Sequence, residues 1–447
     1  MAECATKFAH MLYRGDPSAY IALPLPHGTS TARQLFYAND YWRSLELHKH
    51  HSALGVATTL TPAAPVTLVR PQAAARAARF FAEKFPGRSL YAVKANPSPD
   101  LIRTLFASGI THFDVASIAE VRLVAETLAN ADGGQAKLCF MHPVKAEEAI
   151  AEAYHVHGVR TFSLDTIDEL AKIMRACDNA TDLELCVRLR VSSEHSELSL
   201  ASKFGAELGE TRELLMATRQ AADALGICFH VGSQAMSPQA YSDAIERVRA
   251  AIVDAAVTVD IIDVGGGFPS IYPGMEPVAL ENYFEAIHRG FESLPVSYSS
   301  ELWCEPGRAL SAEYSSIIVR VERRRGKELY INDGAYGALF DAAHVGWRFP
   351  VALLREEDSE EELTGFSFYG PTCDDMDHMV GPFMLPEDVA VGDYIEIGML
   401  GAYGAAMRTG FNGFTSESTI EVEDEPMASL YAEQLPVRRR ATVIKLG

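Results

Sequence analysis

The chain has 447 residues, a length that predicts more than one domain. Hydrophobic residues make up 48% and charged residues 22% of the chain, and this composition is typical of a globular protein and not of a largely disordered one. The net charge of −21 argues against nucleic-acid binding, and neither a signal peptide at the start nor an apolar run of membrane-spanning length is present.

Residues 1–64 form a predicted N-terminal segment with weak periodicity, which we expect to join the β domain in part. The segment contains the basic run His48, Lys49, His50 and His51. No carboxylate or cysteine accompanies these histidines at the spacing that metal ligands need. We therefore interpret the run as an exposed loop or helix face and predict no metal site.

From Pro65 on, short apolar segments alternate with longer helix-patterned stretches, which is typical of βα units with a parallel sheet. Apolar residues at helical spacing follow Pro99, and residues 207–226 and 238–258 form two longer helical windows. After an initial strand at 65–69, eight strand-like segments lie at 90–95, 112–117, 137–142, 160–165, 184–191, 227–232, 259–265 and 301–306. Eight parallel strands separated by helices predict a (β/α)8 barrel over residues 65–310.

Past the last of these strands the pattern changes to short β-rich segments bounded by Gly, Asp or Pro. Examples are SSIIVRVERR, KELYIND, DYIEIG and ATVIKL. These segments predict a mainly antiparallel β domain over residues 311–447. Two acidic runs, Glu356–Glu362 and Glu421–Glu425, are interpreted as exposed loops.

The seven cysteines are scattered without C-x-x-C spacing, and four of them lie inside apolar segments. This pattern predicts reduced core thiols in a cytoplasmic protein, with neither a disulfide framework nor a zinc site. The cysteines are Cys4, Cys139, Cys177, Cys186, Cys228, Cys304 and Cys373.

Polar residues occur near the carboxyl ends of the predicted barrel strands, where barrels of this type gather catalytic groups and often bind phosphate. We expect these residues to converge on one site. They are Lys94, Asp114, Arg188 and His230 near strands one, two, five and six, Gly265, Gly266 and Gly267 after strand seven, and Glu305 and Arg308 after strand eight.

Lys94 lies within the apolar strand segment YAVKAN. A lysine there either reaches solvent along its stem or is functional, because an unpaired buried ammonium is unfavourable. Burial lowers the pKa of a lysine, which is what an imine-forming amine needs. We therefore expect a lowered pKa for Lys94 if it is functional.

The glycine triplet after strand seven forms either a tight turn or a phosphate cradle of backbone N–H groups. It has neither the spacing of a dinucleotide fingerprint nor that of a P-loop. Arg308 can grip the same phosphate, and Glu305 can keep a pyridine nitrogen protonated so that the ring accepts electrons. A structural ion pair between Glu305 and Arg308 is the alternative.

Two further residues have both a structural and a functional interpretation. His230 is either a hydrogen-bonded core residue or a residue that stacks on a cofactor ring, with Ser233 reaching a phosphate. Cys373 lies between turn residues and acids in YGPTCDDMD, which predicts exposure. Its thiol is either inert or reactive.

Together, these segments resemble the ornithine decarboxylase family of fold-type III pyridoxal-phosphate-dependent decarboxylases, which share an alanine-racemase-like fold. The resemblance covers about residues 65–414, and one such motif alone would be a weak signal. Ten motifs occur in family order: YAVKAN, FDVAS, KFGAE, HVGS, DVGGGFP, CEPGRAL, NDGAYG, GPTCDDMD, GDYIEIGMLGAY and FNGF.

The resemblance implies pyridoxal 5′-phosphate (PLP) as the cofactor, bound to Lys94 as a Schiff base. It implies that Glu305 pairs with the pyridine nitrogen, that His230 stacks on the ring, and that Asp114 and Arg188 belong to the surrounding network. The implied phosphate-binding residues are Ser233, Gly265, Gly266, Gly267, Arg308 and Tyr403.

The resemblance also implies residues that act on the substrate. Cys373 matches the thiol that protonates the quinonoid carbon after carbon dioxide leaves. Asp374 and Asp341 match acids that bind the distal ammonium of the substrate. Since Cys373 and Asp374 reach the active site from the other subunit in this family, the resemblance implies a head-to-tail homodimer.

We therefore expect decarboxylation of a basic L-amino acid, ornithine or lysine, to putrescine or cadaverine. A diaminopimelate or carboxynorspermidine decarboxylase is the first alternative, but its substrate carries a distal carboxylate, whereas Asp374 and Asp375 favour a plain ammonium. A non-catalytic regulator similar to antizyme inhibitors is the second, although such proteins lose cofactor-binding or catalytic positions that are all present here. Related alanine racemases have an arginine where Glu305 stands, which favours decarboxylation over racemisation.

Overall fold

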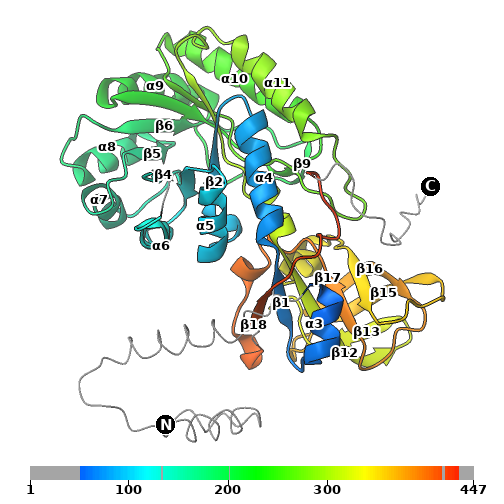
Figure 1. The fold of residues 1–447 in the computed structure, drawn as a ribbon. Helices are drawn as coiled ribbons and strands as arrows, with labels where there is room; N and C mark the ends of the chain where they lie inside the picture. The colour runs from blue at the N-terminus through cyan, green and yellow to red at the C-terminus, as the bar shows by residue number, and fades with distance from the viewer. Residues whose placement is uncertain (1–50, 132–133, 201, 415–417, 432–447) are drawn as a thin grey trace, which may run out of the picture. The chain divides into compact units, whose positions relative to one another are not determined.

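The computed structural model describes residues 51–131, 134–200, 202–414 and 418–431. The chain divides into two compact units, residues 1–49 and 50–447, and only the second contains described residues. Cys4, the run His48 to His50 and the segment ATVIKL lie outside them. Elements carry the labels of Figure 1.

Eight parallel strands close into a barrel in the order β10-β11-β2-β3-β4-β5-β6-β8, which confirms the predicted (β/α)8 barrel. All eight predicted segments overlap a barrel strand, although β2 and β8 begin two and three residues before the predicted segments 90–95 and 227–232. The strands are β2 (Arg88–Ala92), β3 (His112–Val115), β4 (Lys137–Phe140), β5 (Thr161–Leu164), β6 (Glu184–Arg188), β8 (Ala224–Cys228), β10 (Ile261–Asp263) and β11 (Glu301–Cys304).

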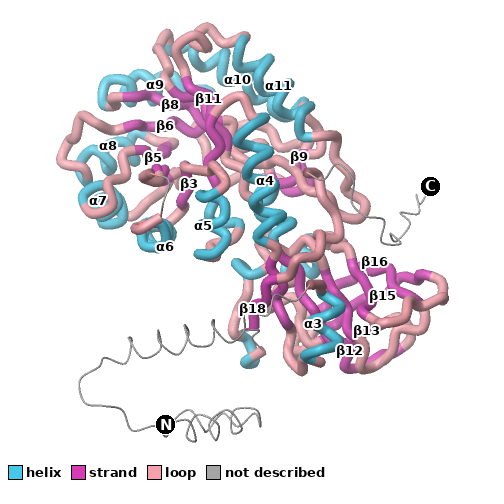
Figure 2. Tube along the Cα trace, in the orientation of Figure 1, coloured by secondary structure: helices cyan, strands magenta, loops and turns pink. Residues whose placement is uncertain are grey.

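Helices separate the barrel strands and surround them (Figure 2). In α5 the residues Leu101, Ile102, Leu105 and Phe106 are buried, as their helical spacing predicted. The barrel helices are α4 (Pro71–Lys84), α5 (Pro99–Ala107), α6 (Ile118–Leu128), α7 (Glu147–His155), α8 (Ile167–Ala176), α9 (Leu208–Ala221), α10 (Gln239–Ala255) and α11 (Leu280–Glu292). The predicted window 207–226 ends early at Ala221, because its last residues belong to β8.

Lys94 follows the first barrel strand instead of lying within it, which corrects the sequence prediction. Strand β2 ends at Ala92, and Val93–Ala95 form a single 3-10 turn, η2. This turn is held from the β domain, since the Ala95 carbonyl accepts from the Tyr403 backbone N–H at 2.7 Å. The turn places Lys94 at the carboxyl end of the barrel.

The β domain is mainly antiparallel, as predicted, with strand order β14-β17-β12-β13-β15-β16. Its strands are β12 (Ser315–Arg325), β13 (Glu328–Ile331), β14 (Val351–Leu354), β15 (Leu363–Tyr369), β16 (His378–Pro386) and β17 (Tyr394–Ile397). The short elements are α12 (Arg308–Ser311), η3 (Ala312–Tyr314), η4 (Asp341–Val345), η5 (Ala405–Met407) and η6 (Phe411–Gly413).

The segment that precedes the barrel contributes to the β domain. Strand β1 (Val66–Val69) pairs with β12 and with β18 (Ser418–Glu421), and helix α3 (Ala53–Leu60) packs in the same small apolar cluster. Two short antiparallel strands, β7 (Ser196–Leu198) and β9 (Ser233–Ala235), join the loop after β6 to the segment after β8. The domain limits at residues 64 and 310 stay predictions.

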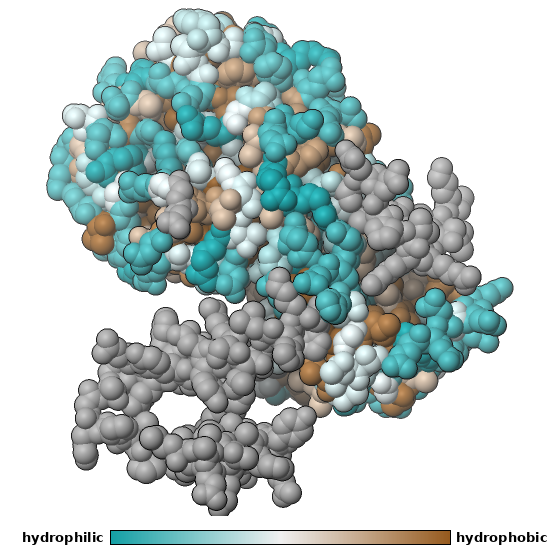
Figure 3. All heavy atoms as spheres, in the orientation of Figure 1, coloured by the Kyte–Doolittle hydropathy of each residue, from teal (hydrophilic) through white to brown (hydrophobic). Residues whose placement is uncertain are grey.

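The barrel helices expose polar residues to solvent and pack apolar residues against the strands. Figure 3 shows hydrophilic residues over most of the helices on the side of the barrel that faces the viewer. The barrel cysteines Cys139, Cys186, Cys228 and Cys304 are buried, and Cys373 is exposed, as predicted. Within the described ranges, no helix has both the length and the hydropathy of a membrane span.

Candidate active site

A cavity of about 380 Å³ lies at the carboxyl ends of the barrel strands. It is lined by residues from strands, loops and the β domain that are far apart in the sequence. All of the predicted cofactor-binding residues except Gly265 line it. They are Lys94, Asp114, Arg188, His230, Ser233, Gly266, Gly267, Glu305, Arg308 and Tyr403. The folded barrel therefore brings the predicted set together.

The Lys94 amine lies against a carboxylate of the neighbouring strand. Its Nζ donates to Asp114 Oδ2 at 2.5 Å, and strand register places Asp114 opposite Ala92, the last residue of β2. Burial by itself would lower the pKa of Lys94, but the charges of Asp114 and Glu305 outweigh burial and raise it. The expected lowered pKa of Lys94 is thus wrong, and the amine must lose a proton before it can act as a nucleophile.

Glu305 follows the last barrel strand and is 8% exposed. Burial raises the pKa of its carboxyl group well above the usual range, and the nearby Asp263 and Asp114 raise it further. Asp263, the last residue of β10, accepts from the Gly265 backbone N–H at 2.8 Å, and burial raises its pKa to about 6. Such a carboxyl group fits a ligand that brings a protonated ring nitrogen into the cavity.

His230 is a neutral imidazole at this site. Burial, Arg188 and Lys94 lower its pKa to about 3. Its Nδ1 accepts from the Gly232 backbone N–H at 3.0 Å, so the ring proton lies on Nε2. A neutral ring fixed in this way fits stacking on a flat cofactor.

The glycine triplet is a tight turn that also lines the cavity. A Cβ on Gly267 would lie 2.5 Å from the Gly232 carbonyl oxygen, and Gly267 has φ +102°. A Cβ on Gly266 would lie 2.8 Å from the Glu305 carbonyl oxygen. Only glycine allows this close approach, so the two interpretations of the triplet are compatible.

Arg308 is the first residue of α12 and is 6% exposed. Its Nη1 donates to the Tyr272 hydroxyl at 3.1 Å, and its Nη2 lies 3.4 Å from Ser233 Oγ and 3.5 Å from Asp341 Oδ2. The carboxylate beside Arg308 is therefore that of Asp341, so the alternative of a Glu305–Arg308 ion pair is wrong. Its Nε has no hydrogen-bond partner among the described residues. A buried cation with spare N–H groups beside a hydroxyl and a glycine turn fits a phosphate.

The residues present therefore fit PLP along the whole cavity. The phosphate-compatible groups lie around Arg308, and the amine of Lys94 and the carboxyl group of Glu305 lie in the same cavity. An aldehyde, a ring nitrogen and a phosphate are the three features of PLP that such groups can bind.

Cys373 and Asp374 do not line this cavity. They lie in the exposed turn between β15 and β16, where the Cys373 backbone N–H donates to Asn412 Oδ1 at 3.2 Å and Asp374 accepts from the Tyr336 hydroxyl. Asp377 holds this turn, since it accepts from the Thr372 backbone N–H at 3.0 Å and from the Ala335 N–H at 2.7 Å. A single chain thus leaves Cys373 at its surface.

Sequence reasoning missed several residues at or beside the cavity. Asp263 is fully buried beside Glu305 and does not line the cavity, but it ends an apolar strand, so the search for polar residues at strand ends could have found it. His142 ends the predicted segment 137–142, so the same search could have found it as well. Lys203 and Phe204 lie on the β6–α9 loop and were marked in the sequence only as part of the motif KFGAE.

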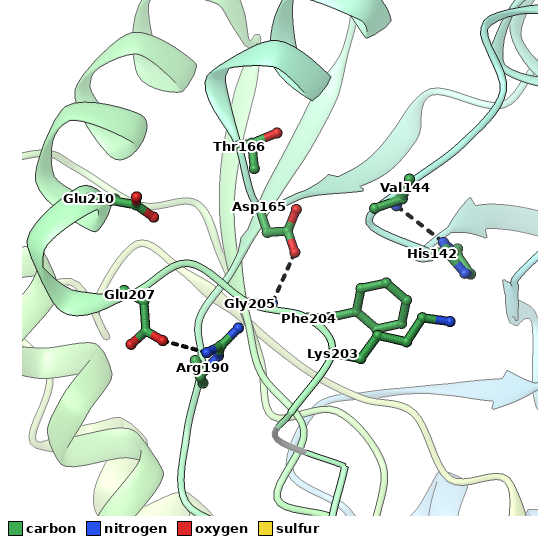
Figure 4. Close-up of a pocket in the computed structure, with 10 residues that line it drawn as sticks. All are labelled: His142, Val144, Asp165, Thr166, Arg190, Lys203, Phe204, Gly205, Glu207 and Glu210. Atoms are coloured by element: carbon green, nitrogen blue, oxygen red, sulfur yellow. Dashed lines mark hydrogen bonds and ion pairs between the residues drawn. The ribbon is translucent and has the colours of Figure 1, made fainter.

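A second cavity of about 500 Å³ adjoins the first at the ends of β4, β5 and β6. His142, Lys203 and Phe204 line both cavities. In Figure 4, Asp165 approaches the Gly205 backbone and Glu207 approaches Arg190, which the structure records as a hydrogen bond of 2.9 Å and an ion pair. These carboxylates are therefore already engaged within the chain.

Comparison with known proteins gives the same picture from independent data. The family model described as "Pyridoxal-dependent decarboxylase, pyridoxal binding domain" matches residues 72–312. The lysine/ornithine decarboxylase of Selenomonas ruminantium is 32% identical over 362 residues, which cover 79% of this chain and 88% of that protein. Antizyme inhibitor 2 of Xenopus laevis is 31% identical over 361 residues, which cover 73% of this chain and 74% of that protein.

A solved structure of SrLDC in complex with PLP and cadaverine is similar in fold. The TM-score is 0.71 at 29% sequence identity, and the match covers 83% of this chain and 94% of that chain. The similarity thus extends across both the barrel and the β domain.

Proposed function

Since this chain belongs to the family of fold-type III pyridoxal-dependent decarboxylases that includes the ornithine and lysine decarboxylases, we propose that its substrate is L-ornithine, with L-lysine as the second candidate. The chain is a PLP-dependent carboxy-lyase that converts a basic amino acid to a diamine. The products would be putrescine from ornithine and cadaverine from lysine.

One observation carries this proposal, namely that a single cavity gathers an amine, a buried carboxyl group and a buried guanidinium. Lys94 would hold the cofactor aldehyde, Glu305 the ring nitrogen, and Arg308 the phosphate. Ser233, Gly266, Gly267 and Tyr403 would complete the phosphate site, and His230 would support the ring face. Gly265 would contribute through the shape of the turn.

When bound, PLP supplies an electron-accepting ring that takes up the electron pair left as carbon dioxide departs. The chain supplies positions and protons. Asp114 holds the proton of the Lys94 amine, and Arg188 adds positive charge beside the neutral His230. Glu305 would hold a ring N–H, because its buried carboxyl group would gain a protonated ring nitrogen as a partner.

The remaining groups would come from a second copy of the chain. We propose a head-to-tail homodimer in which Cys373 of the partner subunit returns a proton to Cα and Asp374 of the partner subunit binds the distal ammonium. The exposure of this turn supports the arrangement, since Met376 beside it is 61% exposed. Asp341, which lies beside Arg308, would be the second acid for the distal ammonium.

A cytoplasmic location is part of the same proposal. It rests on the described cysteines, which are all unpaired, as expected in a reducing compartment.

Two alternatives are tested by the same chemistry. A diaminopimelate or carboxynorspermidine decarboxylase needs a cation for the distal carboxylate, and the turn GPTCDDMD carries acids instead. The similarity to an antizyme inhibitor raises the possibility of a non-catalytic regulator, but Lys94, Glu305 and Cys373 are all retained.

The deciding experiment is release of carbon dioxide by the PLP-loaded protein from ornithine, lysine, arginine and diaminopimelate in parallel. We expect turnover of ornithine or lysine and none of diaminopimelate, and Cys373→Ala should lose the activity while Cys177→Ala, at the end of α8, keeps it. Comparable turnover of diaminopimelate would overturn the distal-ammonium argument. No turnover of any substrate would favour a regulator.

A further inference from the structure

Three aromatic rings surround the guanidinium group of Arg308. Its Cζ lies 4.3 Å from the ring centroid of Trp347, 4.9 Å from that of Tyr403 and 5.8 Å from that of Tyr272. Trp347 and Tyr272 are 6% and 0% exposed and contact each other at 5.4 Å between centroids. Neither is among the residues found to line the cavity in the described structure. Trp347 and Tyr272 therefore contact Arg308 without lining the cavity themselves.

This surrounding leaves the positive charge of Arg308 largely unneutralised. Among the described residues, Asp341 is the one carboxylate within 4 Å, and its ion pair with Arg308, at 3.5 Å, is longer than a charge-assisted hydrogen bond. Burial raises the pKa of Asp341, which weakens it further as an anionic partner. An aromatic face stabilises a cation above its plane without occupying the N–H groups on its edge.

A second buried arginine in the same chain shows the contrast. Arg70 is 1% exposed, and its N–H groups bond Glu396 at 2.8 Å, Ser316 at 2.8 Å and Asp424 at 3.1 Å. Its charge is therefore neutralised within the chain and its hydrogen-bonding edge is occupied. Arg308 instead keeps Nε without a partner and holds only long contacts at Nη2. Arg70 is therefore paired within the chain, whereas Arg308 has N–H groups available for an anion.

We propose that Trp347 and Tyr272 are positioning residues for Arg308. Their rings and the Tyr272 hydroxyl hold the guanidinium group in place as a phosphate-binding cation whose charge is largely not neutralised within the chain. This inference rests on the proposed function, in which that phosphate belongs to PLP. The two residues set how strongly the chain prefers the phosphorylated cofactor over its dephosphorylated form, and they do so without touching it.

The test compares binding of two probes, PLP and pyridoxal, by equilibrium dialysis on Trp347→Leu and on the unaltered chain. Pyridoxal has the same ring and aldehyde but no phosphate. We expect Trp347→Leu to bind PLP about tenfold more weakly, as the loss of a desolvated cation–π contact implies. Binding of pyridoxal should stay unchanged. Trp347→Phe, which restores an aromatic face, should recover most of the preference for PLP.

A matched control removes another buried aromatic of the β domain. Phe383 stacks on Phe368 at 4.1 Å, and Phe383→Leu should keep the unaltered ratio of the two affinities. If Trp347→Leu binds PLP as tightly as the unaltered chain, or loses both probes equally, the inference is overturned. If the leucine variant does not fold, Trp347→Met gives the same comparison, because methionine fills volume without an aromatic face. Failure of the unaltered chain to bind PLP would instead reject the proposed function itself.

Discussion

The titratable side chains in and beside the cavity shift one another's pKa values. The pKa is raised for Lys94, Glu305 and Asp263 and is lowered for His230. The pKa values of the lysine and the histidine therefore move in opposite directions, although both side chains are partly buried and both are cations when protonated. The difference arises because Lys94 contacts the Asp114 carboxylate, whereas His230 faces the cations Arg188 and Lys94.

At this scale the decisive substitution is Lys94→Ala. It should abolish the absorbance band of a protonated pyridoxal imine, which lies at roughly 420 nm, when PLP is added. Lys137→Ala is the matched control, because Lys137 begins β4 at the opposite end of the barrel strands and pairs there with Glu184 at 2.6 Å. The control should keep the band. A band that persists in Lys94→Ala would place the covalent attachment elsewhere.

Among the elements, helix α4, strand β12, strand β17 and the segment after β18 meet at one buried arginine. Arg70 precedes α4, Ser316 lies in β12, Glu396 in β17 and Asp424 after β18. These contacts tie the barrel to the β domain, and thus keep Tyr403 over the turn that carries Lys94.

Arg70→Met should destabilise the chain by about 3–5 kcal/mol, because it leaves the fully buried carboxylate of Glu396 without its partner. Arg88→Met removes a pair of the same 2.8 Å length whose side chains are 50% and 51% exposed, and it should cost less than about 1 kcal/mol. Urea unfolding of both variants measures the difference. Equal losses would show that burial of the pair is not what matters.

A buried carboxyl group makes the docking of the C-terminal segment depend on pH. Glu313 in η3 is 2% exposed and accepts from the Leu430 backbone N–H at 2.9 Å, and burial raises its pKa from 4.5 to about 7. Between these two values the folded chain keeps a proton that the unfolded chain has released. The free energy of unfolding therefore falls as pH rises from about 4.5 to about 7.

Glu313→Gln removes this titration while it keeps an oxygen for the Leu430 N–H. Relative to the unaltered chain, the variant should gain up to about 3 kcal/mol in stability between pH 4.5 and pH 8, measured by urea unfolding at both values. The exposed Glu147, whose pKa is lowered by its hydrogen bond with Arg175, is the control. Glu147→Gln should show no such gain, and a flat difference for Glu313→Gln would contradict the shift.

At the scale of the whole molecule, one chain contains the cofactor cavity but exposes the proposed proton donor, Cys373, at its surface. Lys94 lines the cavity, whereas Cys373 does not. A head-to-tail pair of chains would complete two sites at once, each with the cofactor cavity of one copy and the Cys373 turn of the other.

This arrangement predicts complementation between two inactive variants. Lys94→Ala and Cys373→Ala should each lose activity alone, and unfolding and refolding them together should restore about a quarter of the full activity. In a random mixture half of the dimers are mixed, and one of the two sites in each mixed dimer is intact. Sedimentation should show a dimer. Complete absence of recovery from a mixed dimer would mean that each site is built within one chain.

The fold followed from the sequence because its signals are local and repeated. Each barrel strand is a short apolar run between helical stretches, so each of the eight predicted segments overlaps a strand of the closed barrel. The limits of single elements were less certain, since tertiary contacts decide them. The turn at Lys94 replaces the expected strand end because Tyr403 from the β domain bonds the Ala95 carbonyl.

The sequence by itself determined the barrel, the β domain and the residue types at the strand ends, because hydrophobic periodicity and chain order specify which residues share the carboxyl-terminal edge. Tertiary structure alone decided the charges of those residues and their supports. The raised pKa of Lys94, the neutral His230 and the aromatic surroundings of Arg308 depend on neighbours brought together across large stretches of sequence. Electrostatic and cation–π energies depend on distance in space, which no local pattern encodes.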